Sequence, residues 1–214
     1  MSKHGTTSEF VYSQVKELII SGEIRGGELT SEGAIANVFG TSRTPVREAF
    51  LRLESEGWMT LYPKRGALVN PVAQDEGAHI VEARLLIETG CVRSFIGDHN
   101  HREDAAADLN GSLSRQRTLA ENGERDAFSA EDADFHAIFV RYGGNPLLSE
   151  FYAGLRDRQR RMTSSSVGRD PSQVERIVSD HAELTEYVTA GDIDQFCRVL
   201  DTHVREVHQL TRSR

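Results

Sequence analysis

Four residues in the second half of the chain carry side chains that bind metal ions in proteins: Asp132, His136, His181 and His203. Asp132 and His136 are four residues apart, so on a helix their side chains point the same way. His181 and His203 each stand in an apolar helical stripe where a hydrophobic residue is expected. Because a buried carboxylate needs a compensating partner, one divalent cation held by all four groups would satisfy them together.

The ligand set indicates which metal such a site would take. Nitrogen and oxygen ligands without cysteine favour zinc, with nickel or manganese as alternatives. Each histidine taken singly can instead be a core residue that hydrogen-bonds to its neighbours. The coincidence of three helices, each with a metal-binding side chain at an apolar position, favours the metal site.

Several polar residues near these positions could contact an anionic ligand. Arg84 falls on the apolar face of an expected helix, where it can receive a carboxylate in a bidentate manner or pair with Glu88 one turn away. Arg156 and Arg160 share one helix face and could line the cavity that receives such a ligand. Asn145 precedes a proline, which indicates a helix cap first and a ligand contact second.

A second group of residues, near the N-terminus, has the chemistry of DNA recognition. Arg43, Thr44 and Arg47 lie at the start of a short expected helix. An arginine there can fork onto guanine O6 and N7, and a threonine can donate to a base or a phosphate. Arg52 lies further along the same helix, where contact with the DNA backbone is expected.

A basic turn follows that helix. Lys64, Arg65 and Gly66 lie between two short β runs, where a wing would touch phosphates or the minor groove. The whole chain has a net charge of −8, but residues 43–65 hold five positive and three negative side chains. A local basic stretch can bind phosphates on an acidic protein. A solvated charged face, or a docking module for proteins, is the alternative.

The elements that must position these residues follow from apolar periodicity. Three short helices, at about 8–22, 31–40 and 43–57, precede a hairpin with strands at 58–62 and 67–69. Only helical patterns follow, at about 75–98, 102–122, 124–142, 146–167, 171–190 and 192–212. We therefore predict a mostly α protein, with a winged helix-turn-helix in residues 1–70 and a six-helix antiparallel bundle in residues 71–214.

Composition limits the class of protein. The chain has 214 residues, and 38% of them are hydrophobic, which suffices for a packed core. No apolar run approaches the roughly 18 residues that a membrane helix needs, and no secretion signal opens the sequence. The two cysteines, Cys91 and Cys197, indicate a reducing compartment. We expect a cytoplasmic protein without a membrane partner.

Residues 41–58, with the core Ser-Arg-Thr-Pro-Val-Arg-Glu-Ala at 42–49, strongly resemble the GntR superfamily of bacterial transcription regulators, as does the stretch 63–69. The resemblance covers residues 8–70. It implies that Arg43, Thr44, Arg47 and the wing near Lys64–Gly66 contact operator DNA. Some members carry a DNA-contacting arginine in the second helix where this chain has Gly33, so that contact is absent here.

The second half resembles the FadR-like branch and its FCD ligand-binding domain, and the count of six helices suits the shorter VanR-like subgroup. The shared landmarks lie at 82–88, 132–136, 144–147, His181, 191–192 and His203. The resemblance implies a metal at the four positions named above. It also implies a small organic acid, held by the metal and by an inward arginine such as Arg84.

Together these features predict a homodimeric regulator that binds palindromic operator half-sites and responds to a small carboxylate effector. In one alternative, the metal itself is the signal. In another, the metal centre hydrolyses a substrate. Hydrolysis is disfavoured because the sequence offers no well-placed general base beyond Asp134 or Glu88, and because it leaves the DNA-reading head unexplained. We therefore do not expect an enzyme.

Overall fold

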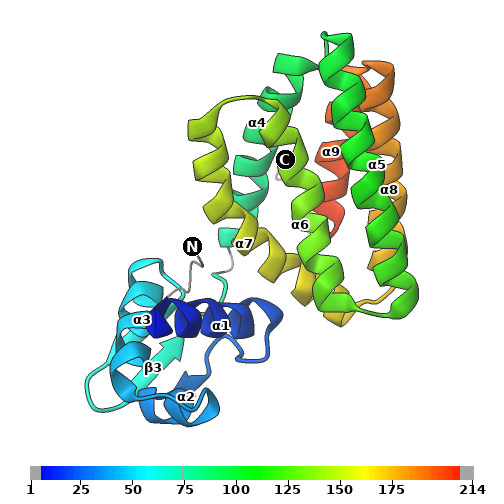
Figure 1. Cartoon of the computed structure of the whole chain (residues 1–214). Coiled ribbons are helices and arrows are strands. Elements are labelled where there is room, and N and C mark those ends of the chain that lie inside the picture. The colour runs from blue at the N-terminus through cyan, green and yellow to red at the C-terminus, as the bar shows by residue number, and fades with distance from the viewer. Residues whose placement is uncertain (1–5, 74, 208–214) are drawn as a thin grey trace. The chain divides into compact units, whose positions relative to one another are not determined.

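The computed structural model describes residues 6–73 and 75–207, which form two compact units divided after Ala73 (Figure 1). The first unit contains α1 (Thr7–Ser21), β1 (Leu29–Thr30), α2 (Glu32–Val38), α3 (Arg43–Ser55), β2 (Met59–Tyr62) and β3 (Gly66–Val69). The second contains α4 (Glu76–Phe95), α5 (His99–Asn122), α6 (Arg125–Tyr142), α7 (Pro146–Arg169), α8 (Gln173–Ala190) and α9 (Ile193–Val207). The predicted fold class is confirmed.

Two helices of the first unit, α1 and α2, begin at hydroxyl caps. The Thr6 hydroxyl accepts the backbone N–H of Glu9 at 3.2 Å, and the Ser31 hydroxyl accepts that of Ala34 at 3.1 Å. Such caps satisfy N–H groups that have no partner within the helix. Gly22 ends α1 in the left-handed conformation, with φ of 84°.

The predicted hairpin is present as β2 and β3, and β1 extends it to a three-stranded sheet. The strand order is β1-β3-β2, and both pairings are antiparallel. Gly66 has φ of 101°, and a side chain there would collide with the carbonyl oxygen of Thr30 on β1. A glycine at the wing is therefore required both by its backbone conformation and by the approach of the extra strand.

Three helices and the sheet enclose one core in the first unit. The predicted apolar faces of α1 and α3 are buried together, and α2 and the strands close the remaining sides. The residues at the centre are Val11, Val15, Ile19, Val46, Ala49, Phe50, Leu53, Trp58, Met59, Ala67 and Val69. Burial of these faces fixes α3 and leaves its polar side exposed.

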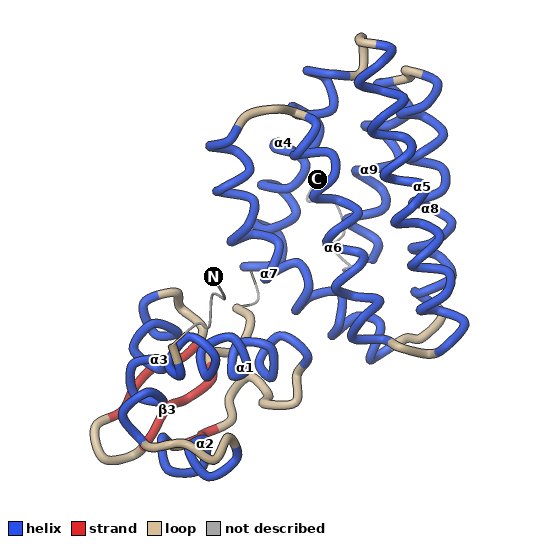
Figure 2. The backbone as a smooth tube through the Cα atoms, viewed as in Figure 1, coloured by secondary structure: helices blue, strands red, loops and turns tan. Residues whose placement is uncertain are grey.

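The second unit is a bundle in which α6 packs against α5, α7 and α4, and α8 packs against α5 and α9 (Figure 2). Its main core combines aromatic and aliphatic side chains, including Phe135, Phe139, Leu184, Val188, Phe196 and Leu200. Gly143 lies so close to Cys91 that a side chain there would overlap the thiol. No helix in the described ranges is both long and apolar enough to cross a bilayer.

Candidate metal centre and DNA-binding surface

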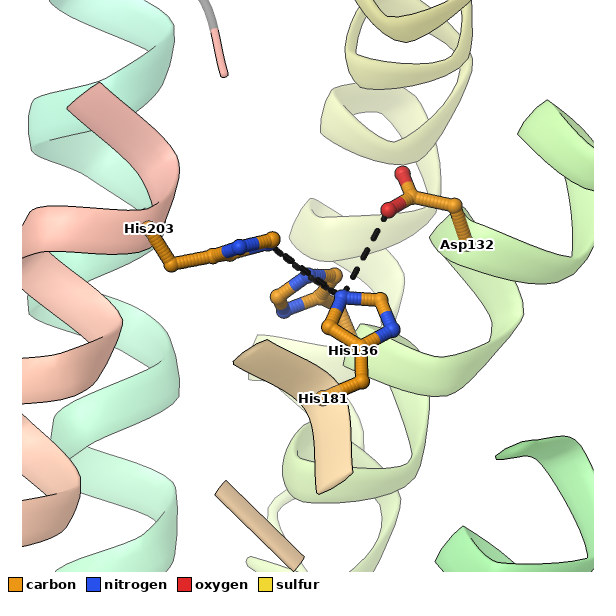
Figure 3. Close-up of side chains that lie close together, drawn as sticks. All are labelled: Asp132, His136, His181 and His203. Atoms are coloured by element: carbon orange, nitrogen blue, oxygen red, sulfur yellow. Dashed lines mark hydrogen bonds and ion pairs between the residues drawn. The ribbon is translucent and has the colours of Figure 1, made fainter. Parts of the chain in front are cut away.

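Four residues of the bundle that the sequence selected come together in its interior (Figure 3). Asp132 and His136 lie one turn apart on α6, His181 lies on α8 and His203 on α9. Each offers one ligand atom, and these atoms lie within 4.8 Å of one another. None of the four side chains is more than 3% exposed. The cluster could therefore hold a metal ion shielded from solvent.

The three imidazoles turn the same nitrogen toward one point. The Nε2 atoms of His136 and His203 are 3.3 Å apart, and the Nε2 atom of His181 lies 3.2 Å from each. A tetrahedral zinc with metal–nitrogen bonds of about 2.0–2.1 Å separates its ligand nitrogens by roughly 3.3–3.4 Å. The spacing of the three nitrogens thus fits one small cation.

Each histidine is oriented through its other nitrogen. The pairs are His136 Nδ1 with Glu88 Oε2 at 2.8 Å, His181 Nδ1 with Gln116 Oε1 at 2.8 Å, and His203 Nδ1 with Asp180 Oδ2 at 3.0 Å. Oxygen acceptors at Nδ1 keep the ring proton there and leave the Nε2 lone pair facing the cluster. Burial and the two neighbouring histidines lower the pKa of His181 well below its ordinary value, which favours the neutral ligand form.

The two carboxylate oxygens of Asp132 have different surroundings. Its Oδ2 accepts hydrogen bonds from Gln159 at 3.2 Å and Thr163 at 3.0 Å. Its Oδ1 lies 3.6 Å from Nε2 of His181, on the side of the cluster. Burial raises the pKa of Asp132 more than Arg84 and His203 lower it. A cation beside Oδ1 would favour the ionised carboxylate, which is the form that can bind the cation.

Arg84 lies buried next to this cluster. Its Nε donates to Glu88 Oε1 at 2.7 Å, and the Tyr152 hydroxyl donates to the same oxygen at 2.7 Å. The predicted pairing with Glu88 is therefore present. Its Nη2 is also buried, and it has no hydrogen-bond partner among the described residues. One donor of this arginine is thus available to an anion, which keeps the second predicted role open.

The remaining effector candidates lie elsewhere. Asn145 is exposed, and its side-chain oxygen accepts the N–H groups of Leu147 and Leu148, so the predicted cap of α7 is present and the ligand contact stays a prediction. Arg156 forms an ion pair with Asp134 and lines an outer cleft of about 540 Å³ between α5, α6 and α7. Arg160 is partly buried one turn further along α7. Arg156 therefore belongs to the outer cleft and not to the metal cluster.

In the first unit, Arg43, Thr44 and Arg47 are exposed at the start of α3, as predicted. The Arg43 guanidinium lies against Gly33, since a Cβ atom at residue 33 would be 3.4 Å from its Nη2. A side chain at residue 33 would therefore touch the Arg43 guanidinium at ordinary van der Waals distance.

The other basic side chains differ in how they are held. Lys64 and Arg65 are exposed at the wing tip, where Lys64 has φ of 62°. The Arg52 guanidinium instead stacks 3.7 Å from the Tyr12 ring centroid and donates to Glu56 at 3.2 Å. Arg52 thus connects α3 to α1, and its expected contact with the DNA backbone stays a prediction.

Sequence reasoning missed most residues that orient the histidines. Asp180 precedes His181 in sequence but serves His203 on another helix. Gln116 and Tyr152 carried no signal, because polar residues in long helices are common on solvated faces. Only the i, i+4 spacing of Arg84 and Glu88 pointed to any part of this network.

Family models match both units. Residues 7–69 match the bacterial regulatory proteins of the gntR family, and residues 79–206 match the FCD domain. The chain therefore belongs to the GntR-family transcription regulators that carry an FCD domain, as the sequence resemblance indicated. The family and the curated relatives are regulators, so the protein is a DNA-binding regulator and not an enzyme.

Individual relatives agree with this assignment. The chain is 28% identical, over 92% of its length and 87% of the relative's, to a probable D-xylose utilization operon transcriptional repressor of Paenarthrobacter nicotinovorans. It is 33% identical over 66% of its length to the gluconate operon transcriptional repressor of Bacillus subtilis, of which the match covers 56%. The solved structure of Escherichia coli McbR/YncC shares the fold, with a TM-score of 0.77 at 19% identity over 96% of this chain and 98% of that one.

Proposed function

We propose that this regulator changes its affinity for operator DNA when a small carboxylate binds beside a divalent cation inside the bundle. The observation that carries the proposal is the convergence of three Nε2 lone pairs, each fixed by an acceptor at Nδ1, next to a free carboxylate oxygen of Asp132. Asp132, His136, His181 and His203 would hold the cation. Zinc fits this set best, with nickel or manganese as alternatives.

The buried charges favour an anionic effector. Among the charged groups that are at most 2% exposed, Arg84, Glu88 and Asp132 together carry one excess negative charge. Asp180, the partner of His203, is partly exposed and forms an ion pair with Arg176, so it does not change this balance. A divalent cation reverses this to one excess positive charge, which is costly to bury without a counter-ion. A single carboxylate group would balance the site. When bound, the cation would supply a Lewis-acidic position for one carboxylate oxygen.

Arg84 is the side chain we assign to the effector. Its Nη2 is buried beside the cluster without a described partner, and its Nε is anchored by Glu88. An arginine held at one edge can present the other to a carboxylate without losing much conformational entropy. The similarity to a repressor named for the gluconate operon is in keeping with a sugar-acid effector.

We assign operator contact to Arg43, Thr44 and Arg47 at the start of α3, and to Lys64 and Arg65 on the wing. These side chains are exposed, whereas the opposite face of α3 is buried in the core. A helix presented in this way can enter the major groove with its first residues toward the bases. Contact with chromosomal DNA implies a cytoplasmic protein.

A second copy of the chain completes the proposal. Three large hydrophobic side chains of the bundle are well exposed: Leu86 on α4, and Leu147 and Phe151 on α7. The two helices pack against each other, so one self-complementary face can carry all three side chains. Paired reading heads would suit palindromic half-sites. Replacing Leu86 and Phe151 with Glu should give a monomer by light scattering, whereas Glu at exposed Leu51 of α3 should not.

Operator binding by four forms of the full-length protein tests the effector proposal. Metal-free and metal-loaded protein, each without and with a panel of organic acids, should be titrated against the operator in the same salt. We expect a carboxylate to change the operator affinity only when metal is present. If metal alone produces the full change, the protein is a metal sensor. If an acid acts equally on metal-free protein, the effector does not use the cation.

A further inference from the structure

We propose that Glu131, near the surface of the bundle, determines which nitrogen of His181 faces the cluster, acting through Ser112 and Gln116. Glu131 would thus be a positioning residue of the metal centre, although it contacts no ligand. The inference rests on the proposed metal site and adds a part to it that neither the sequence pattern nor the relatives suggested.

The hydrogen bonds from His181 to Glu131 form one continuous series. His181 Nδ1 is 2.8 Å from Gln116 Oε1, Gln116 Nε2 is 3.4 Å from Ser112 Oγ, and Ser112 Oγ is 2.6 Å from Glu131 Oε1. His181, Gln116 and Ser112 are fully buried. The Glu131 side chain is 13% exposed and accepts two hydrogen bonds from Arg115, at 3.0 and 2.9 Å. The series of hydrogen bonds therefore runs from the metal-binding cluster to the ion pair of Glu131 and Arg115 at the surface.

Which group donates and which accepts in this series of hydrogen bonds depends on Glu131, at its outer end. A carboxamide can turn over and present either an acceptor or a donor, so Gln116 alone cannot decide where the proton of His181 resides. An ionised carboxylate can only accept, so Ser112 must donate to Glu131. The Ser112 oxygen then accepts from the Gln116 amide, and the Gln116 oxygen must face His181. The ring proton is thereby held at Nδ1, and Nε2 is left to the cation.

His181 differs in this respect from the other two histidines. His136 and His203 donate directly to carboxylates, Glu88 and Asp180, which need no further partner to fix their direction. A carboxylate at residue 116, which is fully buried, would cancel the excess positive charge proposed to receive the effector. A neutral amide directed from a distance orients the ring and leaves that charge in place.

The test uses the substitution Glu131→Gln, with Glu121→Gln as a control that removes an exposed carboxylate from α5. In the metal-free full chain, ¹⁵N NMR of the imidazole nitrogens reports the protonation site of His181. We expect protonation at Nδ1 in the parent and the control, and a mixture of both tautomers in the variant. Zinc affinity, measured by competition with a chelator, should fall by up to about 100-fold, the upper end of the loss that follows removal of a direct partner of a metal ligand.

A second substitution distinguishes orientation from packing. Adding Gln116→Glu to the Glu131→Gln variant supplies a fixed acceptor at His181, and it should restore both the Nδ1 tautomer and zinc affinity. Ser112→Ala, which interrupts the series of hydrogen bonds at its middle, should behave like Glu131→Gln. A packing defect alone would not be repaired by a charge at residue 116.

The outcomes separate this inference from the proposed function. If Glu131→Gln and Ser112→Ala both keep the parent tautomer and zinc affinity, Glu131 does not position His181, even though the metal site stands. If the double variant shows no recovery, the inference is also wrong. If the parent binds no zinc, the proposed metal function fails, while the NMR comparison still decides whether Glu131 controls the proton.

Discussion

Arg84 holds Glu88 with one nitrogen and has another buried nitrogen for which no described partner exists. Replacing it with Gln keeps a donor for Glu88 but removes the second donor and the charge. We expect the variant to retain its metal and to bind the carboxylate at least ten-fold more weakly, since a hydrogen bond to a charged group contributes about 1.5–3 kcal/mol. Calorimetric titration of the metal-loaded variant checks this, and simultaneous loss of metal would show that Arg84 serves the cation site instead.

Arg47 and Arg52 lie on the same helix but should respond differently to truncation. Arg47 is exposed at the start of α3, whereas Arg52 stacks on Tyr12 and pairs with Glu56. Arg47→Ala should cost about 1–3 kcal/mol of operator binding if the guanidinium forks onto a guanine. Arg52→Ala should lower thermal stability and leave base preference unchanged. Binding curves on operator and random DNA decide, and an equal reduction on both would limit Arg47 to phosphate contact.

The four cluster residues were predictable because periodicity places each of them on an inward face of its own helix. Their orienting partners were not. Gln116 and His181 are 65 positions apart, and the partner of His203 is the neighbour of a different ligand. Such pairs depend on how helices pack against each other, which the spacing of residues within one helix does not encode.

The wing is an element whose contribution to DNA binding should depend on salt. Replacing Lys64 with Asn, which tolerates the left-handed backbone found there, and Arg65 with Ala removes both charges without straining the turn. Affinity for all DNA should fall, and the salt dependence should flatten by about 0.9 for each phosphate that the wing no longer neutralises. The same measurement on Arg117→Ala, an exposed arginine of α5, should give the parent slope. An unchanged slope in the wing variant would exclude contact with phosphates.

Glu56 joins α3 to α1 and gives the first unit a dependence on pH. Burial raises the pKa of Glu56, whereas hydrogen bonds from Tyr12 and Lys16 lower it. The lowering is the larger effect, so the pKa of Glu56 lies below its ordinary value of 4.5. A depressed pKa stabilises the fold above the unfolded value and loses this contribution as the pH falls through the folded value. Glu56→Gln should therefore lower the melting temperature at pH 7, and the difference should shrink below about pH 4.5.

Glu48→Gln, at an exposed position of the same helix, is the control for that comparison. Its melting temperature should follow the parent at both pH values. A difference for Glu56→Gln that stays constant down to pH 3 would mean that poorer packing, and not the missing ionised carboxylate, destabilises the variant.

Element prediction succeeded where periodicity was long and failed where it was short. The six helices of the bundle appear at the expected positions within the described residues, although the expected end of the last helix lies beyond Val207 and outside that range. β1 has only two residues, Leu29 and Thr30, too few for an alternating pattern. Its pairing with β3 is fixed by the tertiary fold, in which Gly66 lets the carbonyl group of Thr30 approach closely.

At the scale of the whole molecule, the buried cluster suggests how a ligand could change the protein. Its residues come from α6, α8 and α9, and they are closed off from solvent. A carboxylate can reach the cation and Arg84 only if these helices move apart. Binding energy at the site would then be coupled to helix positions, which is a route for an effector to alter dimer geometry and operator affinity.

The metal content of purified protein tests the central claim most directly. The full chain, exposed to zinc and dialysed, should retain one equivalent by elemental analysis. His203→Ala should retain well under a tenth of that at limiting zinc, because one of four ligands is gone. His79→Ala, at an exposed position of α4, should match the parent. A full equivalent in His203→Ala, or none in the parent, would mean that the three histidines are core residues and that the bundle contains no metal centre.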